Sequence, residues 1–317
     1  MKLLIGANSV SNPKYAAIHE RAKEVFDEVV LNPFGRTLTS EEVIACWDGV
    51  DAILAGTEKY TAEMMDHAPS TLKVISRHGV GVENIDLNAA HLRGITVCNT
   101  PGANADAVAE ATMGLILSVL RKIPLSDHYV RTNEWKRPEG HLIKGKTIGV
   151  IGMGNIGKGV ILRSEPFGAE FIAYDPYFDK DFGEKHNVTC AGIEEVLKTA
   201  DIITLHLPST PETHHIINAE TLSIMKVGAV LINTARGELV DEEALYMALK
   251  SGRLGGAGLD VYSCEPLYNS DLFALENIVM TPHMAGNTSE TTLNMGMWAL
   301  ENAIKVVTGQ EGAVIVK

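Results

Sequence analysis

The segment Thr147-Ile-Gly-Val-Ile-Gly-Met-Gly-Asn-Ile-Gly157 decides the fold of this chain. Its first half, Thr147–Ile151, is a short apolar run of the kind that forms a buried β-strand. Gly152, Gly154 and Gly157 follow in the spacing G-x-G-x-x-G, and a helical pattern comes after them. A strand that enters a glycine turn and continues as a helix predicts a βαβ unit, whose strands are parallel.

Each part of this pattern has a physical role in binding a dinucleotide. Gly152 permits a tight turn, Gly154 lets the backbone approach a pyrophosphate, and Gly157 lets the helix pack closely on the strand. The start of the helix offers unpaired N–H groups to the phosphates. The next strand, Phe171–Tyr174, ends at Asp175, whose carboxylate can accept hydrogen bonds from ribose hydroxyls. No Arg directly follows Asp175 to receive a 2′-phosphate, so the pattern favours NAD over NADP.

The same alternation of short apolar strands and helical patterns continues along the whole chain. It predicts an α/β fold with two parallel-sheet domains, Rossmann-like or flavodoxin-like, and a cleft between them. Pro166 is expected to end the helix of the glycine motif early. The predicted strands are Leu3–Ile5, Ala52–Ala55, Val74–Ser76, Thr96–Cys98, Thr147–Ile151, Phe171–Tyr174, Ile202–Leu205, Val230–Asn233, Gly256–Asp260 and Ile278–Met280, and the clearest helical patterns are Ser40–Trp47, Ala103–Arg121, Asp241–Lys250 and Ser289–Thr308.

The composition is that of a globular protein, and it argues against several classes of function. The chain has 317 residues, of which 45% are apolar and 21% charged, enough for two domains. A net charge of −13 argues against nucleic acids and anionic membranes as partners. No apolar run is long enough for a transmembrane helix or a signal peptide, so a cytoplasmic protein is expected. The four cysteines are scattered and the histidines lack metal-ligand spacing, so no metal site is expected.

Three polar residues in the second half of the chain come shortly after predicted strands. These are Arg236, Glu265 and His283. Ligands of open parallel sheets bind beyond the carboxyl ends of the strands, so the three side chains can converge on one crevice. Taken singly, each has a plainer explanation, because charged loop residues are usually solvated and a lone histidine is more often structural. The combination therefore carries the argument.

This combination fits hydride transfer to or from a secondary alcohol, a reaction that needs a base for the hydroxyl proton. Histidine suits that role because its ordinary pKa of about 6.5 lies close to the working pH. A carboxylate such as Glu265 can orient the imidazole of His283, and the planar guanidinium of Arg236 can bind a substrate carboxylate. The sequence therefore predicts an oxidoreductase that uses NAD and acts on a small anionic hydroxy acid.

Several motifs spread along nearly the whole chain point to one known family. They are Lys73–Asp86, Asn99–Glu110, the glycine motif, His206–Pro208, Asn233–Asp241, Gly258–Val261, Glu265–Pro266 and Pro282–His283. Together they resemble the D-isomer-specific 2-hydroxyacid dehydrogenases. The resemblance implies NAD as cofactor, hydride transfer at C2 of a small D-2-hydroxy acid or 2-keto acid, and a homodimer joined through the cofactor domains. It also implies a substrate-binding domain of residues 1–99 with 288–317, and an NAD-binding domain of residues 100–287.

The resemblance further implies roles for individual residues. Arg236, Glu265 and His283 would form the catalytic triad, and the backbone N–H groups of Val80 and Gly81 would help to hold the substrate carboxylate. The residues implied at the cofactor are Gly152, Met153, Gly154, Asn155, Ile156, Gly157, Asp175, His206, Pro208, Thr234, Ala235, Arg236, Asp260, His283 and Gly286, and those implied at the substrate are Arg77, His78, Val80, Gly81, Asn104, Arg236 and His283.

The substrate stays open between several small anionic acids. Around Arg77 the chain most resembles the catalytic core of D-3-phosphoglycerate dehydrogenase. Ala55 and Gly56, however, stand where those enzymes have an Arg and a Ser that help to bind phosphate. A phosphate or phosphonate can still be met by Lys59, Arg77 or His78. The alternative, which Ala55 and Gly56 favour, is a reductase of hydroxypyruvate or glyoxylate.

A function of another class is an interaction protein that senses NADH. The C-terminal binding protein corepressors resemble the same family and act through partners. The intact triad and the lack of basic runs typical of nuclear localisation favour the enzyme over this alternative.

Overall fold

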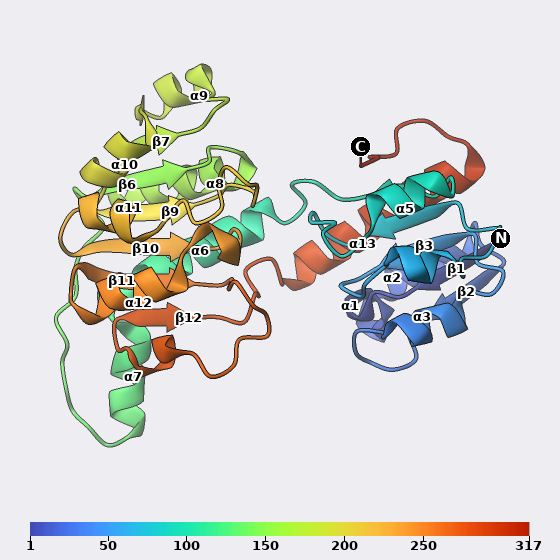
Figure 1. Ribbon diagram of the computed structural model, residues 1–317, viewed down its shortest axis with the longest axis horizontal. Helices are drawn as coiled ribbons and strands as arrows, with labels where there is room; N and C mark the ends of the chain where they lie inside the picture. The colour runs from blue at the N-terminus through green and yellow to red at the C-terminus, as the bar shows by residue number, and fades with distance from the viewer. Residues whose placement is uncertain (317) are drawn as a thin grey trace. The chain divides into compact units, whose positions relative to one another are not determined.

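The computed structural model describes residues 1–316 and divides them into two compact units (Figure 1). Unit 1 comprises Met1–Asn104 together with the residues from Asn287 onward, and unit 2 comprises Ala105–Gly286. Each unit is a parallel β-sheet with apolar cores on both faces, so the α/β fold expected from the sequence is confirmed. Among the described residues, no helix has both the length and the apolar character needed to cross a membrane.

Unit 1 is built on a five-stranded sheet in the order β2-β1-β3-β4-β5. All neighbouring strands are parallel, because helical connections return the chain to the same edge of the sheet before each new strand. The strand order reverses between β1 and β3, the position at which sheets of this type bind ligands. The elements are β1 (Lys2–Ile5), α1 (Asn8–Ser11), α2 (Ala16–Lys23), β2 (Glu28–Leu31), α3 (Ser40–Cys46), β3 (Ala52–Ala55), α4 (Ala62–Met65), β4 (Val74–Arg77), α5 (Leu87–Leu92), β5 (Thr96–Cys98) and α13 (Ser289–Thr308).

Two apolar cores cover the two faces of this sheet. Helices α3, α4 and α5 pack on one face around the buried Trp47. Helices α2 and α13 pack on the other, where they contribute Ile18 and Leu300 among other buried residues. The side chain of Thr288 caps the start of α13, and Gly309 ends the helix with a φ of 71°. The last helix of the chain therefore completes the core formed by its first hundred residues.

Unit 2 is built on a seven-stranded parallel sheet in the order β12-β11-β10-β9-β6-β7-β8. The six strands from β6 to β11 have the order of a dinucleotide-binding sheet, and β12 extends it at one edge. The elements are α6 (Ala105–Arg121), α7 (Ile123–Arg131), β6 (Thr147–Ile151), α8 (Asn155–Ser164), β7 (Glu170–Tyr174), α9 (Lys180–Lys185), β8 (Val188–Cys190), α10 (Ile193–Thr199), β9 (Ile202–Leu205), α11 (Ala219–Ile224), β10 (Ala229–Asn233), α12 (Glu242–Lys250), β11 (Leu254–Leu259) and β12 (Ile278–Met280).

Helices cover both faces of this second sheet. On one face lie α6 and α8, which approach closely because Gly159 has no side chain; an added Cβ there would be 3.0 Å from the Cβ of Ala109. On the other face lie α10, α11 and α12, with buried residues such as Val196, Leu222 and Leu245. The carboxyl ends of all seven strands are left at one edge of the sheet, where the connecting loops can carry a site.

The apolar pattern of the sequence did not predict two of the strands, and both are edge strands. β2 is the outer strand of the five-stranded sheet and β8 is the outer strand of the seven-stranded sheet. Strand β8 is three residues long and mostly exposed, whereas β2 contains the apolar run of residues 29–31 but has no buried residue. The prediction for β11 is also shifted: the strand begins at Leu254 rather than Gly256, and Asp260 lies just beyond its end.

The helix after the glycine motif is short, as expected from the proline. Helix α8 ends at Ser164, and a single 3₁₀ turn, Glu165–Phe167, follows it. Helix α6 begins at Ala105, two residues later than the predicted helical pattern, and residues 132–146 contain neither helix nor strand.

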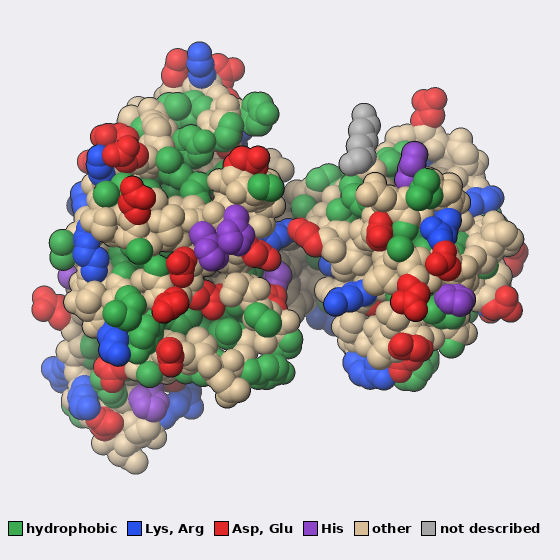
Figure 2. All heavy atoms as spheres, viewed as in Figure 1, with side chains coloured by type: hydrophobic (Ala, Val, Ile, Leu, Met, Phe, Trp, Pro, Cys, Tyr) green, Lys and Arg blue, Asp and Glu red, His purple; other side chains and the backbone are tan. Residues whose placement is uncertain are grey.

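Acidic side chains are spread over the visible face of both units and do not gather in one patch (Figure 2). Some of the ion pairs connect separate helices. Arg21 of α2 pairs with Glu301 of α13 at 2.7 Å, and Arg163 of α8 pairs with Asp106 of α6 at 2.8 Å. Because these pairs are partly exposed, each stabilises the fold by less than about 1 kcal/mol.

We predict that a buried hydroxyl stabilises the contact between α13 and its sheet. The Oγ of Ser76 in β4 donates to the carbonyl of Ala299 in α13 at 2.7 Å, and both residues are buried. Ser76→Ala should lower the free energy of unfolding by about 1 kcal/mol in urea denaturation followed by circular dichroism. Ser223→Ala, which removes an exposed hydroxyl that also donates to a carbonyl, should change it much less. Equal effects of the two substitutions would contradict this account.

Candidate active site

The turn after β6 has a backbone that glycine alone accommodates at two points. Gly152 has a φ of 99°, and a Cβ there would lie 2.6 Å from the carbonyl oxygen of His206. A Cβ on Gly157 would lie 2.2 Å from the carbonyl oxygen of Gly152. At Gly154, in contrast, nothing lies within 4 Å of an added Cβ. The turn is therefore closed on its inner side and open at Gly154.

The start of α8 and the end of β7 lie beside this turn. Gly154 is the capping residue of α8, and no side chain caps the first N–H groups of the helix. Asp175 follows β7 and is fixed by two backbone donors. Its Oδ2 accepts from the N–H of Met153 at 2.6 Å and its Oδ1 from the N–H of Tyr177 at 2.7 Å. The carboxylate is thereby attached to the glycine turn itself.

His206 follows β9, the neighbour of β6 on the other side of the turn. Its Nε2 lies 2.9 Å from Oγ1 of Thr204, and its Nδ1 is buried without a partner among the described residues. Burial lowers the pKa of His206 to about 3, so the imidazole is neutral at physiological pH. The part of the chain that the structure describes contains no cluster of three or more His, Cys, Asp and Glu side chains able to hold a metal ion.

The last residues of β10, β11 and β12 are neighbours in the sheet register. Arg236, Glu265 and His283 lie in the three loops that follow these strand ends. Parallel pairing therefore places the loops side by side, as expected from the sequence.

His283 and Glu265 form a hydrogen-bonded pair. Nδ1 of His283 lies 2.6 Å from Oε2 of Glu265. Because a carboxylate only accepts hydrogen bonds, Nδ1 carries a hydrogen, and Nε2 is the nitrogen that remains to exchange a proton. The other oxygen of Glu265 accepts from the N–H of Tyr262 at 3.0 Å, which orients the carboxylate. The His283 side chain is 55% exposed, so the pair can act as a general acid or base on a ligand.

A buried carboxylate holds the loop that carries His283. Asp260 is 1% exposed, and both of its oxygens are engaged. Oδ1 accepts from Oγ1 of Thr281 at 2.6 Å and from the N–H of Met284 at 2.8 Å, while Oδ2 accepts from the N–H of Ala285 at 2.9 Å. His283 itself has a φ of 49°, and its N–H donates to the carbonyl of Asp260 at 2.8 Å. Asp260 therefore maintains an unfavourable backbone conformation at His283.

The Arg236 loop lies directly against the loop before Glu265. Arg236 precedes a single 3₁₀ turn that starts at Gly237, where an added Cβ would be 1.9 Å from the carbonyl carbon of Tyr262. The buried Asn233 fixes this loop: its Nδ2 donates to the carbonyl of Arg236 at 2.8 Å, and its Oδ1 accepts from the N–H of Ala235 at 3.0 Å. Nη1 of Arg236 donates to the carbonyl of Ala235 at 2.8 Å, and a guanidinium can bind a carboxylate through two parallel hydrogen bonds.

In unit 1 most of the predicted substrate residues follow β4. Arg77 ends the strand and is half-buried; its Nη1 donates to the carbonyl of His78, and its Nε has no partner among the described residues. Burial lowers the pKa of Arg77. In the next turn, the N–H groups of Val80 and Gly81 donate to no acceptor within residues 1–316. Two free, partly exposed N–H groups of this kind can hold an anion.

His78 is a structural part of unit 1 rather than an exposed cation. Its Nε2 donates to the carbonyl of Thr292 in α13 at 3.1 Å, and its Nδ1 accepts from the hydroxyl of Ser9 at 3.4 Å. Burial lowers the pKa of His78 to about 4, so the ring carries no positive charge at neutral pH. The side chain connects the β4 loop to α13 and adds no positive charge for a substrate.

The other predicted site residues lie in loops or at helix ends. Thr234 is buried, with its Oγ1 2.8 Å from that of Thr112 in α6. The remaining positions are the exposed Asn155 and Pro208, the partly exposed Ile156, Asn104 and Gly286, and the buried Ala235 and Met153.

Sequence reasoning misses one residue that supports the site. The hydroxyl of Tyr262 donates to the carbonyls of Leu259 and Thr281 at 3.2 and 3.0 Å, which joins the loops after β11 and β12. Its backbone N–H orients Glu265. The partners of Tyr262 are backbone groups brought together by strand register, so no side-chain motif signals its role.

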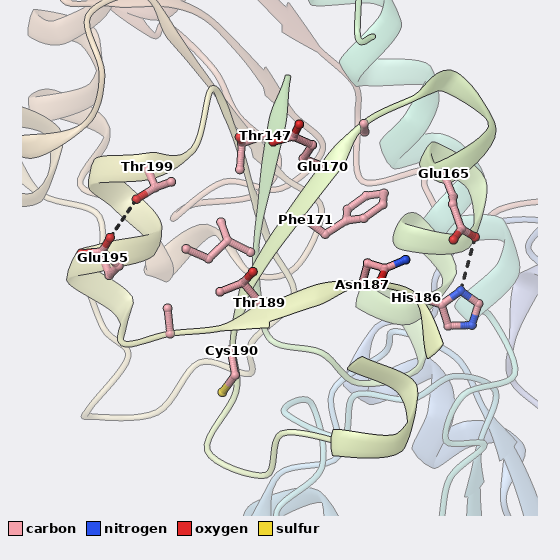
Figure 3. A pocket seen from close by; sticks show the side chains of 13 residues that line it. Thr147, Glu165, Glu170, Phe171, His186, Asn187, Thr189, Cys190, Glu195 and Thr199 are labelled. Atoms are coloured by element: carbon pink, nitrogen blue, oxygen red, sulfur yellow. Dashed lines mark hydrogen bonds and ion pairs between the residues drawn. The ribbon is translucent and has the colours of Figure 1, made fainter. Parts of the chain in front are cut away.

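The candidate site does not coincide with a pocket of about 650 Å³ elsewhere in unit 2. Thr147 and Glu170, which line this pocket, begin β6 and β7, so it lies toward the amino ends of these strands. Figure 3 shows Glu195 with Thr199 on one side and Glu165 with His186 on the other. None of the predicted site residues lines it within the described chain. The glycine turn and the His283 loop lie at the carboxyl ends, where open parallel sheets bind ligands.

Residues 113–285 match the family described as the NAD binding domain of D-isomer specific 2-hydroxyacid dehydrogenases. This range includes the glycine turn, Asp175 and the loops after β10, β11 and β12.

Two curated relatives are similar to most of the chain. A D-3-phosphoglycerate dehydrogenase from Methanocaldococcus jannaschii is 42% identical over 298 residues, which cover 92% of this chain and 56% of the relative. A glyoxylate reductase from Thermococcus litoralis is 41% identical over 271 residues, which cover 82% of each chain. The chain thus spans little more than half the length of the first relative. Among solved structures, the TT0316 protein from Thermus thermophilus covers 100% of both chains with a TM-score of 0.89 and 37% identity.

We predict that Asp260 contributes strongly to stability through its three hydrogen bonds. Asp260→Ala leaves the hydroxyl of Thr281 and two backbone N–H groups without an acceptor, so the free energy of unfolding should fall by about 3 kcal/mol in urea denaturation. Asp181→Ala, which changes an exposed carboxylate at the start of α9, should have an effect below about 0.5 kcal/mol. A loss at Asp260 no larger than at Asp181 would show that the loop does not depend on this carboxylate.

Proposed function

The chain belongs to the D-isomer specific 2-hydroxyacid dehydrogenase family, and from this premise we propose that it transfers a hydride between NAD and C2 of a small anionic D-2-hydroxy acid or 2-keto acid. One observation supports the proposal above the others. Nδ1 of His283 is hydrogen-bonded to Oε2 of Glu265 at 2.6 Å, and the strand ends that precede the Arg236, Glu265 and His283 loops are neighbours in the sheet. This arrangement provides the acid–base group and the carboxylate-binding group that the reaction needs.

The residues of unit 2 fit NAD. The glycine turn is open at Gly154, the start of α8 has no side-chain cap, and Nδ1 of His206 is buried without a protein partner among the described residues. We assign the pyrophosphate to the turn and the adenosine ribose to Asp175, whose negative charge disfavours the 2′-phosphate of NADP. When bound, NAD supplies the acceptor for the hydride, and NADH supplies the donor.

His283 is assigned the proton transfer. In the oxidation direction, Nε2 of neutral His283 takes the proton of the C2 hydroxyl while the hydride leaves C2, and the C–O bond becomes a carbonyl. In the reduction direction the same nitrogen returns the proton to the oxygen. Glu265 holds Nδ1–H and stabilises the positive charge on the imidazolium that forms.

In unit 2, the carboxylate of the substrate is assigned to the guanidinium of Arg236, which also polarises the neighbouring C2 oxygen. In unit 1, the N–H groups of Val80 and Gly81 are donors suited to an anion, and this supports residues 1–99 and 288–317 as the substrate-binding domain. Relatives of the chain include a phosphoglycerate dehydrogenase and a glyoxylate reductase, so the proposed substrates are small 2-keto acids with and without a phosphate.

We also propose that the protein is a cytoplasmic homodimer joined through unit 2. Large apolar side chains are exposed on α7 and the segment after it, namely Ile123, Val130, Trp135 and Leu142. The Trp135 side chain is 80% exposed, although an indole of this size is usually covered. A second copy of the chain that covers this surface would bury these side chains.

The acid–base role predicts that His283→Ala abolishes turnover without loss of cofactor binding. NADH oxidation at 340 nm with glyoxylate or hydroxypyruvate should slow by about 10²- to 10⁴-fold, because the proton has no donor or acceptor. Binding of NADH, measured by its fluorescence, should change by less than about twofold, since the glycine turn and Asp175 are intact. His67→Ala, at an exposed histidine of unit 1, is the matched control. A His283→Ala protein that keeps most of its activity would contradict the proposed acid–base role.

The dimer proposal predicts that Trp135→Ser shifts the protein toward monomers. Sedimentation equilibrium should give an increase of at least about tenfold in the dimer dissociation constant, as expected for loss of a large interface aromatic residue. Tyr177→Ser, at another exposed aromatic of unit 2, should leave the association unchanged. A monomeric wild-type protein, or equal behaviour of the two variants, would rule out this interface.

A further inference from the structure

Glu58, in the loop after β3, is a buried carboxylate that the proposed chemistry does not use. It is 2% exposed, although glutamate is rarely buried to this extent in proteins. Its position in unit 1 is therefore a feature that needs a physical explanation.

The carboxylate of Glu58 lies between the carboxyl ends of β1 and β3. Gly6 follows β1 and Gly56 follows β3. A Cβ on Gly6 would be 2.7 Å from Oε1 of Glu58, and a Cβ on Gly56 would be 2.6 Å from Oε2. The two glycines thus provide the space that the carboxylate fills. This space lies at the point where the strand order reverses, the usual ligand position in such a sheet.

Two donors hold the carboxylate in this position. Oε1 accepts from the N–H of Gly56 at 2.7 Å and from the hydroxyl of Tyr60 at 2.9 Å. Burial, and secondly the charge of Glu58, raises the pKa of Tyr60, so this hydroxyl keeps its proton. The side chain of Asn84 fixes the loop by donating to the carbonyls of Glu58 and Gly56 at 2.6 and 3.2 Å. The N–H of Gly56, which would otherwise be available to an anionic ligand, is therefore already used.

The negative charge of Glu58 also acts on Arg77. β4 is the neighbour of β3, and Arg77 is opposite Ala55, the last residue of β3. Burial lowers the pKa of the half-buried Arg77, and the charges of Glu58 and Glu83 oppose this shift. These carboxylates offset part of the positive charge of Arg77, so a second anionic group of a substrate would gain less from Arg77 and would be repelled by Glu58. Lys59, the nearest lysine in the sequence, has an exposed side chain.

We propose that Glu58 is a specificity residue that restricts the substrate to 2-keto acids whose side chain carries no phosphate or phosphonate. A phosphate near the ends of β1 and β3 would meet the negative charge of Glu58 and would find the N–H of Gly56 already used. A hydrogen or a neutral hydroxyl at that end of the substrate, as in glyoxylate and hydroxypyruvate, is not repelled. This inference rests on the proposed function, because it concerns the choice among substrates of the same reaction.

The test is the effect of Glu58→Gln on substrate preference. The amide oxygen of Gln can still accept from Gly56 and Tyr60, so the substitution removes the charge and keeps the shape. We expect wild-type protein to reduce glyoxylate and hydroxypyruvate with a kcat/KM at least about tenfold above that for 3-phosphohydroxypyruvate and 3-phosphonopyruvate. Glu58→Gln should raise kcat/KM for the two substrates with a phosphate or phosphonate about tenfold, mainly through KM, and change the others less than about threefold. Glu63→Gln, at an exposed glutamate of α4, is the matched control and should leave all four values unchanged.

The outcomes separate this inference from the proposed function. If the wild-type protein turns over none of the four keto acids, both the proposed function and the inference are overturned. If the wild-type protein prefers the substrates with a phosphate or phosphonate, the inference alone is overturned. The same holds if a folded Glu58→Gln protein has the substrate preference of the wild-type protein. If circular dichroism shows that Glu58→Gln does not fold, inhibition of the wild-type protein decides. The inference requires D-glycerate to inhibit at lower concentration than D-3-phosphoglycerate, and the reverse order would refute it.

Discussion

Every strand of both sheets runs parallel to its neighbours, and this single constraint organises the molecule. Parallel pairing places all carboxyl ends of a sheet at one edge, so loops that are far apart in the sequence become neighbours. In unit 2 this brings the glycine turn after β6 next to His206, and the Glu265 loop next to His283. The proposed chemistry depends on these neighbours, because no one loop contains both a phosphate-binding turn and an acid–base pair.

Buried polar groups then fix the loops that parallel pairing brings together. In unit 2, Asp260 holds the His283 loop, and Asn233 holds the Arg236 loop. In unit 1, Glu58 fills the space between Gly6 and Gly56. All three are buried and hydrogen-bonded, as the cost of burying an unpaired polar group requires. In unit 2 these hydrogen bonds fix the loops that carry Arg236 and His283, and in unit 1 we infer that the buried Glu58 excludes a class of substrate.

The fold was largely predictable because most of its strands are short apolar runs bounded by turns. The strands β3, β5, β6, β9 and β12 have the predicted bounds, although β5 and β12 are edge strands. The edge strand β8 was not predicted because it is three residues long and has only one buried residue, and the apolar edge strand β2 was missed as well. In the candidate site, the glycine turn and the positions of Arg236, Glu265 and His283 after neighbouring strands could be predicted from motif and spacing. Tyr262 could not, because its partners are backbone carbonyls of two separate loops.

The sequence by itself determined the fold class, the glycine turn and the types of residue that the proposed chemistry needs. These properties follow from local patterns: glycine spacing, apolar periodicity and polar residues after strands. Only the tertiary structure decided which nitrogen of His283 is available, that His78 is neutral, and that Glu58 is buried between β1 and β3. The physical reason is that a side chain's charge, protonation and exposure depend on neighbours from distant segments, and only folding assembles those neighbours.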